Sequence, residues 1–136
     1  MALSVAKANQ AIEAALARAR ELSLNVSVSI CDSRGHLIAH QRMDGALDDA
    51  SHSSIGKAIA AALSGRPSEE HLKGIPDRPP IATVWAAGAP ILHKRGGLPI
   101  IRQGEVEGAL GVSGAPTNEQ DEECARAGIR ELQHEH

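Results

Sequence analysis

Residues 96–115, with the sequence GGLPIIRQGEVEGALGVSGA, constrain the fold more than any other stretch of this chain. Leu98–Ile101 is short and apolar, and a second apolar run, Val106–Val112, follows after a tight polar turn at 103–105. Two such runs around a short turn predict a β-hairpin. At least part of the core is therefore expected to form on an antiparallel sheet.

The glycines of this stretch are closely spaced at Gly108, Gly111 and Gly114. Glycine weakens the interior of a strand, so its repeated use predicts that a helix, a ligand or another backbone approaches the sheet at these positions. Two interpretations stay open, namely close packing without a ligand and a binding surface. Packing explains such glycines more often.

The remaining pattern predicts three helices and a second hairpin. The predicted elements are a helix capped by Ser4 and ending before Asn25, strands at 26–31 and 37–43, a helix from about 49 to 64, and a last helix capped by Thr117. Residues 81–85 are a further candidate strand. Hairpins grouped with helices in this way favour an α+β antiparallel sheet over parallel βαβ units.

Several segments together resemble one protein family. The 96–115 stretch followed by QDEECARAGI, with RMDGA and SIGKAIAAAL upstream, is similar to the GlcG/HbpS family, whose relatives include the C-terminal domain of PduO-type proteins. The resemblance covers nearly the whole chain. It implies an α+β, profilin-like antiparallel sheet of about five strands flanked by helices, and homo-oligomers built from dimers, up to octamers.

The same resemblance implies binding of a small molecule. Some relatives bind haem, and others are linked to the metabolism of small organic acids without an agreed reaction. Haem is therefore the cofactor that the resemblance suggests, and no other is expected. A haem site usually surrounds the macrocycle with apolar and aromatic groups, whereas Trp85 is the sole aromatic residue among Phe, Tyr and Trp in this chain.

Length and charge limit the class of protein. The 136 residues predict a single GlcG/HbpS-like domain, 1–136, large enough to bury a core without disulfides. The formal net charge of −3, with scattered lysines and arginines, argues against nucleic acid as a partner. The amphipathic N-terminus does not resemble a secretory signal and no apolar run spans a membrane, so we expect a cytoplasmic protein without membrane contact. Cys31 and Cys124 are expected to be buried free thiols.

Polar residues distant in sequence are candidates for one site. If the strand at 37–43, the following helix and the Gly96-Gly97 loop converge as the resemblance implies, basic and imidazole side chains meet beside that loop. Such a pocket suits a carboxylate, because guanidinium groups and turn amides bind anions. The predicted ligand-binding residues are Arg42, Asp44, Gly96, Gly97 and Pro99. The alternative is a surface ion pair between Arg42 and Asp44 and a solvated Lys57.

Three residues are assigned chemical roles. His52 and His93 are the predicted general bases or metal ligands, and Lys57 is the predicted anion anchor or amine of lowered pKa. The acidic run at 119–123 is expected to be a solvated first turn that stabilises its helix, with ferric-ion binding as the alternative.

Three functions follow from these patterns. The first is a small-ligand-binding protein of the GlcG/HbpS type, with haem as the suggested ligand. The alternative is a cofactor-independent lyase, isomerase or hydrolase acting on a small oxygenated organic acid near the Gly96-Gly97 loop. The third is a structural or regulatory oligomer.

Overall fold

The computed structural model describes residues 2–70 and 91–133. Its elements are α1 (Val5–Glu21), β1 (Ser27–Asp32), β2 (Leu37–Arg42), α2 (Ala50–Ser64), β3 (Gly97–Arg102), β4 (Glu105–Ser113) and α3 (Asn118–Gln133). The candidate strand at 81–85 lies outside the described residues. Both predicted hairpins and all three predicted helices are confirmed.

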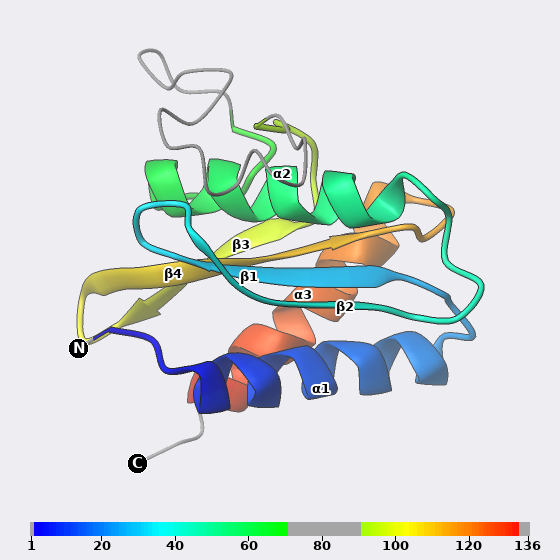
Figure 1. Ribbon diagram of the computed structural model, residues 1–136, viewed down its shortest axis with the longest axis horizontal. Coiled ribbons are helices and arrows are strands. Elements are labelled where there is room, and N and C mark those ends of the chain that lie inside the picture. The colour runs from blue at the N-terminus through cyan, green and yellow to red at the C-terminus, as the bar shows by residue number, and fades with distance from the viewer. Residues whose placement is uncertain (1, 71–90, 134–136) are drawn as a thin grey trace.

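The four strands form one antiparallel sheet in the order β2-β1-β4-β3. Helix α2 lies on one face of this sheet, and α1 and α3 lie on the other (Figure 1). The predicted α+β, profilin-like architecture is confirmed, with four strands in the described part of the chain where about five were expected. The order places β2 and β3 at opposite edges, which decides which site residues can meet.

Local signals fix the ends of the elements. The hydroxyl of Ser4 accepts a hydrogen bond from the N–H of Lys7 at 3.1 Å and caps α1. Gly65 ends α2 in the left-handed conformation. The β3–β4 turn uses Gln103 and Gly104, both with positive φ, as a two-residue hairpin turn requires.

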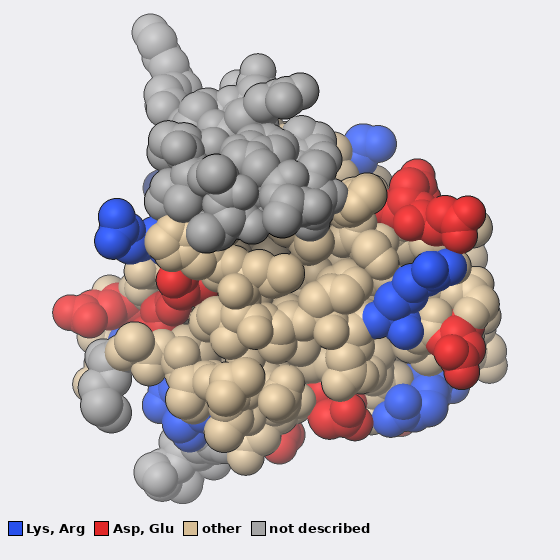
Figure 2. Space-filling model, in the orientation of Figure 1, with Lys and Arg blue, Asp and Glu red and all other residues tan. Residues whose placement is uncertain are grey.

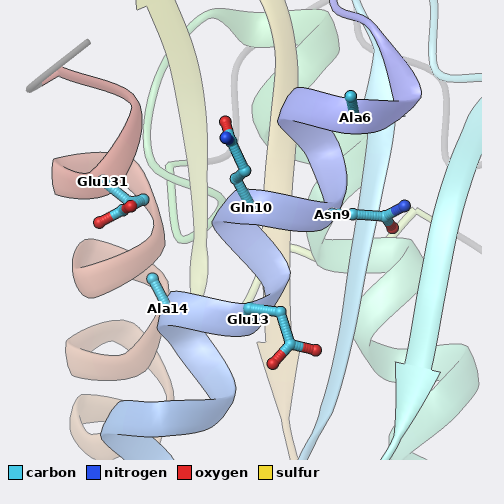
Figure 3. Close-up of a pocket in the computed structure, with 6 residues that line it drawn as sticks. All are labelled: Ala6, Asn9, Gln10, Glu13, Ala14 and Glu131. Atoms are coloured by element: carbon cyan, nitrogen blue, oxygen red, sulfur yellow. The ribbon is translucent and has the colours of Figure 1, made fainter.

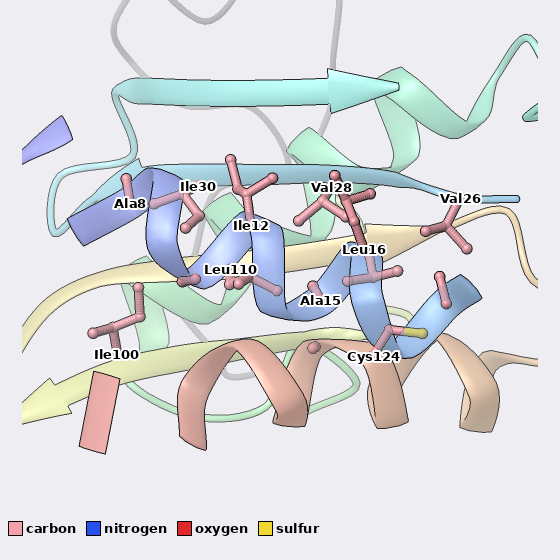
Figure 4. Packing of buried hydrophobic residues seen from close by; sticks show 14 of the residues in the cluster. Ala8, Ile12, Ala15, Leu16, Val26, Val28, Ile30, Ile100, Leu110 and Cys124 are labelled. Carbon is pink, nitrogen blue, oxygen red and sulfur yellow. The ribbon is translucent and has the colours of Figure 1, made fainter. Parts of the chain in front are cut away.

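The main core fills the space between the sheet and the α1–α3 layer. Figure 4 shows aliphatic side chains from α1, β1 and β4 interleaving there, among them Ile12, Val28, Ile30 and Leu110, each fully buried. The buried residues of this cluster include no aromatic side chain. Small residues such as alanine therefore let the layers lie close together.

The closely spaced glycines lie where backbones approach one another. A Cβ atom added at Gly111 would lie 2.2 Å from the carbonyl oxygen of Ser54 in α2. One added at Gly108 would lie 2.2 Å from the carbonyl oxygen of Cys31 in β1. The predicted close approach is thus confirmed, and packing alone accounts for these two glycines.

Candidate functional site

Lys57 extends a buried amine from α2 past the start of β3. Its side chain is 2% exposed, and its Nζ donates to the carbonyl oxygen of Val112 at 3.0 Å and to Oδ2 of Asp121 at 3.1 Å. The other carboxylate oxygen of Asp121 accepts the N–H of Ala115 at 2.9 Å. Both oxygens of this buried carboxylate are thus hydrogen-bonded.

The double glycine makes room for this arrangement. Gly96 has a φ of +133°, and a Cβ atom there would lie 2.8 Å from Lys57 Nζ and 2.7 Å from the oxygen of Val112. A Cβ atom at Gly97 would lie 2.4 Å from the backbone oxygen of Lys57. Ser68, which is itself buried, holds the segment in place, since its hydroxyl accepts the N–H of Gly97 at 2.8 Å. Only glycine at both positions allows β3 to start against α2.

The amine opens onto a pocket of about 190 Å³, which we call the Lys57 pocket. Its wall combines two lysines, two aspartates, small polar residues and backbone. The lining residues are Leu47, Asp49, Ala50, Ser53, Lys57, Leu92, Lys94, Ser113, Gly114, Ala115, Asn118 and Asp121. An ammonium group has three N–H donors. Within the described part of the chain Val112 and Asp121 take two, which leaves one for a guest.

Burial changes the acidity of both members of the pair. It lowers the pKa of Lys57, and the nearby carboxylate of Asp121 opposes that shift. Burial likewise raises the pKa of Asp121, and the Lys57 amine opposes it. Each group is moved toward its neutral form, so proton exchange between them is easier than in water.

The structure brings some predicted site residues together. Lys57 and Gly96 are in contact, and Gly97 lies beside them. His93 lies between Leu92 and Lys94, which both line the pocket, and its side chain is half-buried. Pro99 lies further along β3, opposite Ala109, and is not part of the pocket wall.

Arg42 and Asp44 lie elsewhere. The sheet order puts the end of β2 at the edge opposite β3. Arg42 donates to Asp48 at 3.1 Å and to the oxygen of Ala46 at 3.2 Å. Arg42 and Asp44 line a separate hollow of about 240 Å³ with Met43 and Gly45. The structure does not bring them into the Lys57 pocket, and their role in binding stays a prediction.

His52 is exposed in the first turn of α2 and does not line the Lys57 pocket. Its neighbour is His40, whose pKa is lowered first by burial and then by the charge of His52. His40 belongs to a chain of hydroxyl groups between the sheet and α2 that sequence reasoning did not identify.

The acidic first turn of α3 was misinterpreted from sequence. Asp121 and Glu122 are buried rather than solvated. Asp121 pairs with Lys57, and Glu122 accepts from Nε of Arg95 at 3.0 Å, so both have structural partners rather than free oxygens for a ferric ion. The sequence did contain an indication that Asp121 is buried, because it falls on the apolar stripe of the helix with Cys124.

Metal-binding clusters are not found in residues 2–70 and 91–133. No group of three or more His, Cys, Asp or Glu side chains there is placed to hold an ion. Cys31 and Cys124 are free and buried, as predicted. Burial raises the pKa of Cys124 to about 11, which makes it a poor nucleophile.

A larger hollow of about 420 Å³ lies between α1 and α3. Figure 3 shows its polar side chains, Asn9, Gln10, Glu13 and Glu131. It has no basic residue on its wall, so it lacks the charge that a carboxylate requires.

The fold and the pocket define a small α+β domain in which two helical layers enclose an antiparallel sheet and a buried lysine faces a polar cavity. The sequence profile of the family described as "Haem degrading protein HbpS-like" matches residues 3–130. The chain therefore belongs to the HbpS-like family, which includes GlcG-type proteins. Within the described residues, no helix is both long and apolar enough to cross a membrane.

Named relatives agree with this assignment. Protein GlcG of Escherichia coli K12 is 35% identical over 112 residues, covering 82% of this chain and 81% of the relative. The structure of a double mutant of HbpS from Streptomyces reticuli is 30% identical, with a TM-score of 0.81, covering 98% of this chain and 89% of the other. A PduOC complex with haem is 29% identical, with a TM-score of 0.77 and coverage of 96% and 95%.

Proposed function

We propose that this protein binds a small organic acid in the Lys57 pocket. The observation that carries the proposal is the buried amine of Lys57 on the pocket wall, where, among the described residues, Asp121 and Val112 take two of its three N–H donors. Lys94 adds a second positive charge to the wall. Asp121 and Asp49 offset the two lysine charges, so the wall carries no net charge, and a carboxylate would be held by the lysine N–H donors rather than by a net positive field.

The size and polarity of the pocket narrow the class of ligand. Its volume of about 190 Å³ is below the roughly 300–1,000 Å³ typical of sites for drug-sized ligands. Asp49, Ser53 and Asn118 supply acceptors and donors beside the lysines. We therefore expect a short acid that also carries hydroxyl or oxo groups.

Calorimetric titration with two- to four-carbon hydroxy and oxo acids tests this proposal. We expect saturable binding that weakens at least tenfold in Lys94→Gln, while Lys7→Gln, which changes a lysine on α1 outside the pocket, binds as the wild type does. Absence of binding for every acid, or equal affinity in Lys94→Gln and the wild type, would exclude the proposal.

Haem is the second candidate, because the family description and the PduOC complex both name it. A pocket of about 190 Å³ is too small for a macrocycle, so a haem would lie elsewhere on the molecule. Haem iron takes an imidazole ligand, and His52 and His93 are its predicted ligands. Haemin titration should then give a saturable Soret band that one of His52→Ala and His93→Ala removes and His36→Ala keeps.

The two candidates are separable in one experiment. Haemin held by His52, which does not line the Lys57 pocket, should leave the affinity for short acids unchanged, whereas haemin held by His93 should lower it. An enzymatic role adds a third readout, because the shifted acidities of Lys57 and Asp121 suit proton transfer to or from a bound acid. Turnover of the bound acid that is lost in Lys57→Met, while the circular dichroism spectrum of that variant matches the folded wild type, would support that role.

A further inference from the structure

We propose that Ser51 is a nucleophile activated by His40, and that this pair accepts small acyl groups from esters. The proposed site lies between the end of β2 and the first turn of α2, and Lys57 is not part of it. It is therefore independent of the acid-binding function proposed above.

An unbroken chain of hydrogen bonds joins His40 to Ser51. His40 Nδ1 lies 2.7 Å from Ser29 Oγ, and Ser29 Oγ lies 2.7 Å from Ser54 Oγ. Ser54 in turn donates to the backbone oxygen of Ser51 at 2.8 Å. On the other side of the ring, His40 Nε2 lies 3.3 Å from Ser51 Oγ.

The directions of these bonds follow from counting protons. The single hydroxyl proton of Ser54 is used on the oxygen of Ser51, so Ser29 must donate to Ser54. Ser29 Oγ then accepts from His40, which places the proton of the neutral ring on Nδ1. Nε2 is left with a lone pair that faces the hydroxyl of Ser51. This is the tautomer that a general base for Ser51 requires.

The hydrogen bonds on Nδ1 are shielded from water. Ser29 and Ser54 are fully buried, so the bonds that orient the imidazole ring lie inside the protein. Ser27 Oγ lies 3.4 Å from Ser51 Oγ and can donate to it. When Ser27 donates to Ser51 Oγ, the hydroxyl proton of Ser51 is not used on Ser27 and can point at His40 Nε2.

The pair is partly exposed. His40 and Ser51 are half-buried rather than enclosed. Figure 1 shows that the end of β2 and the start of α2 lie at the same end of the molecule, and Figure 2 shows charged side chains gathered there. In the first turn of α2 the N–H of Ala50 already donates to the oxygen of Leu47, and the N–H of Ser53 donates to the oxygen of Asp49. The N–H groups of Ser51 and His52 are therefore the ones proposed to receive a developing oxyanion.

The chemistry is acyl transfer with no cofactor. Ser51 Oγ bonds to the carbonyl carbon of an ester while its proton passes to His40 Nε2. The tetrahedral centre then expels the alcohol, which takes that proton, and an acyl-serine remains. Water, deprotonated by the same nitrogen, hydrolyses the acyl-serine to a carboxylic acid and restores the hydroxyl.

A fluorophosphonate probe tests the nucleophile directly. We expect covalent labelling of the folded protein at Ser51, located by peptide mass spectrometry. Labelling should disappear in Ser51→Ala, fall at least tenfold in His40→Ala, and recover in that variant when imidazole is added. Ser33→Ala, which removes an exposed hydroxyl in another turn, should label as the wild type does.

The tautomer gives a second test that needs no variant. The ¹⁵N spectrum of the neutral wild-type protein should show His40 protonated at Nδ1 and unprotonated at Nε2. A proton on Nε2, absence of labelling in the folded wild type, or labelling that persists in Ser51→Ala would each overturn the proposal.

Discussion

At the scale of single residues, the most consequential contact for stability is the buried ion pair between Lys57 and Asp121. Both side chains are almost fully withdrawn from water, and their charged atoms lie 3.1 Å apart. Such a pair is not by itself a large source of stability, since removing two charges from water offsets their attraction. Replacing only one of the two residues lowers stability strongly, because the remaining residue is then left as an unpaired buried charge.

Replacing either partner alone should therefore destabilise the protein strongly. We expect Lys57→Met and Asp121→Leu each to lower the free energy of unfolding by about 3–5 kcal/mol, and the double variant to lose less than the two losses added together. Urea denaturation measures all three. Arg66→Met, which breaks an exposed pair with Glu70, should change stability by less than about 0.5 kcal/mol. Additive losses would contradict the coupling.

His40 should make stability depend on pH. Its pKa in the folded protein is lowered below 6.5 by burial and by His52. Between that lowered value and 6.5 the unfolded chain binds more protons than the folded one, so stability falls as the pH is lowered through this window. The loss should be smaller in His40→Gln, measured by thermal unfolding across pH 7 to 5. An equal loss in both proteins would contradict the assignment.

Sequence reasoning found one half of the buried pair. Lys57 was predicted to be an anion anchor or an amine of lowered pKa in a pocket beside the Gly96-Gly97 loop, with a solvated side chain as the alternative. Asp121 was assigned to solvent, since a carboxylate in a first turn has an ordinary electrostatic explanation. Contacts between residues 64 positions apart leave no local trace except the position of Asp121 on the apolar stripe.

At the scale of elements, the distance between α2 and the sheet is set by glycine.

Apolar periodicity predicted every described helix and strand, because those patterns are local. It did not determine which strands are neighbours. Arg42 and Gly97 were expected to meet, and the order β2-β1-β4-β3 separates them. Strand order depends on packing between distant segments, which periodicity does not contain.

Gly111→Ala should force α2 away from β4. Its new Cβ atom would lie 2.2 Å from the oxygen of Ser54 and 2.7 Å from the nitrogen of Ala58, both backbone atoms. We expect a loss of about 1–3 kcal/mol or more in the free energy of unfolding. Gly104→Asn is the control, since no atom lies within 4 Å of that position and asparagine tolerates its positive φ. Equal stability of the two variants would show that α2 can shift freely.

At the scale of the whole molecule, β2 and β3 form the two edges of the sheet within residues 2–70 and 91–133. Each carries one exposed large aliphatic side chain, Leu37 on β2 and Ile101 on β3. Open edges are surfaces on which other chains can pair. The middle of the face that includes β2 carries few charged side chains (Figure 2), which suits β2 to self-association.

We therefore expect the predicted homo-oligomer to use the β2 edge. Light scattering coupled to gel filtration should show a dimer or a multiple of it for the wild type. Leu37→Lys should lower the mass at equal concentration, whereas Ile101→Lys should leave it unchanged. A monomeric wild type would contradict the expectation from the resemblance, and the reverse order of effects would move the contact to β3.

The Lys57–Asp121 contact joins parts of the molecule that the sheet otherwise separates. Lys57 belongs to α2 on one face, and Asp121 belongs to α3 on the other. A guest that draws the amine toward itself weakens the hydrogen bond by which Lys57 of α2 holds Asp121 of α3. Ligand binding in the Lys57 pocket should therefore speed amide hydrogen exchange at the start of α3, on the other face of the sheet. The Lys57 side chain, rather than movement of the sheet, would transmit this effect.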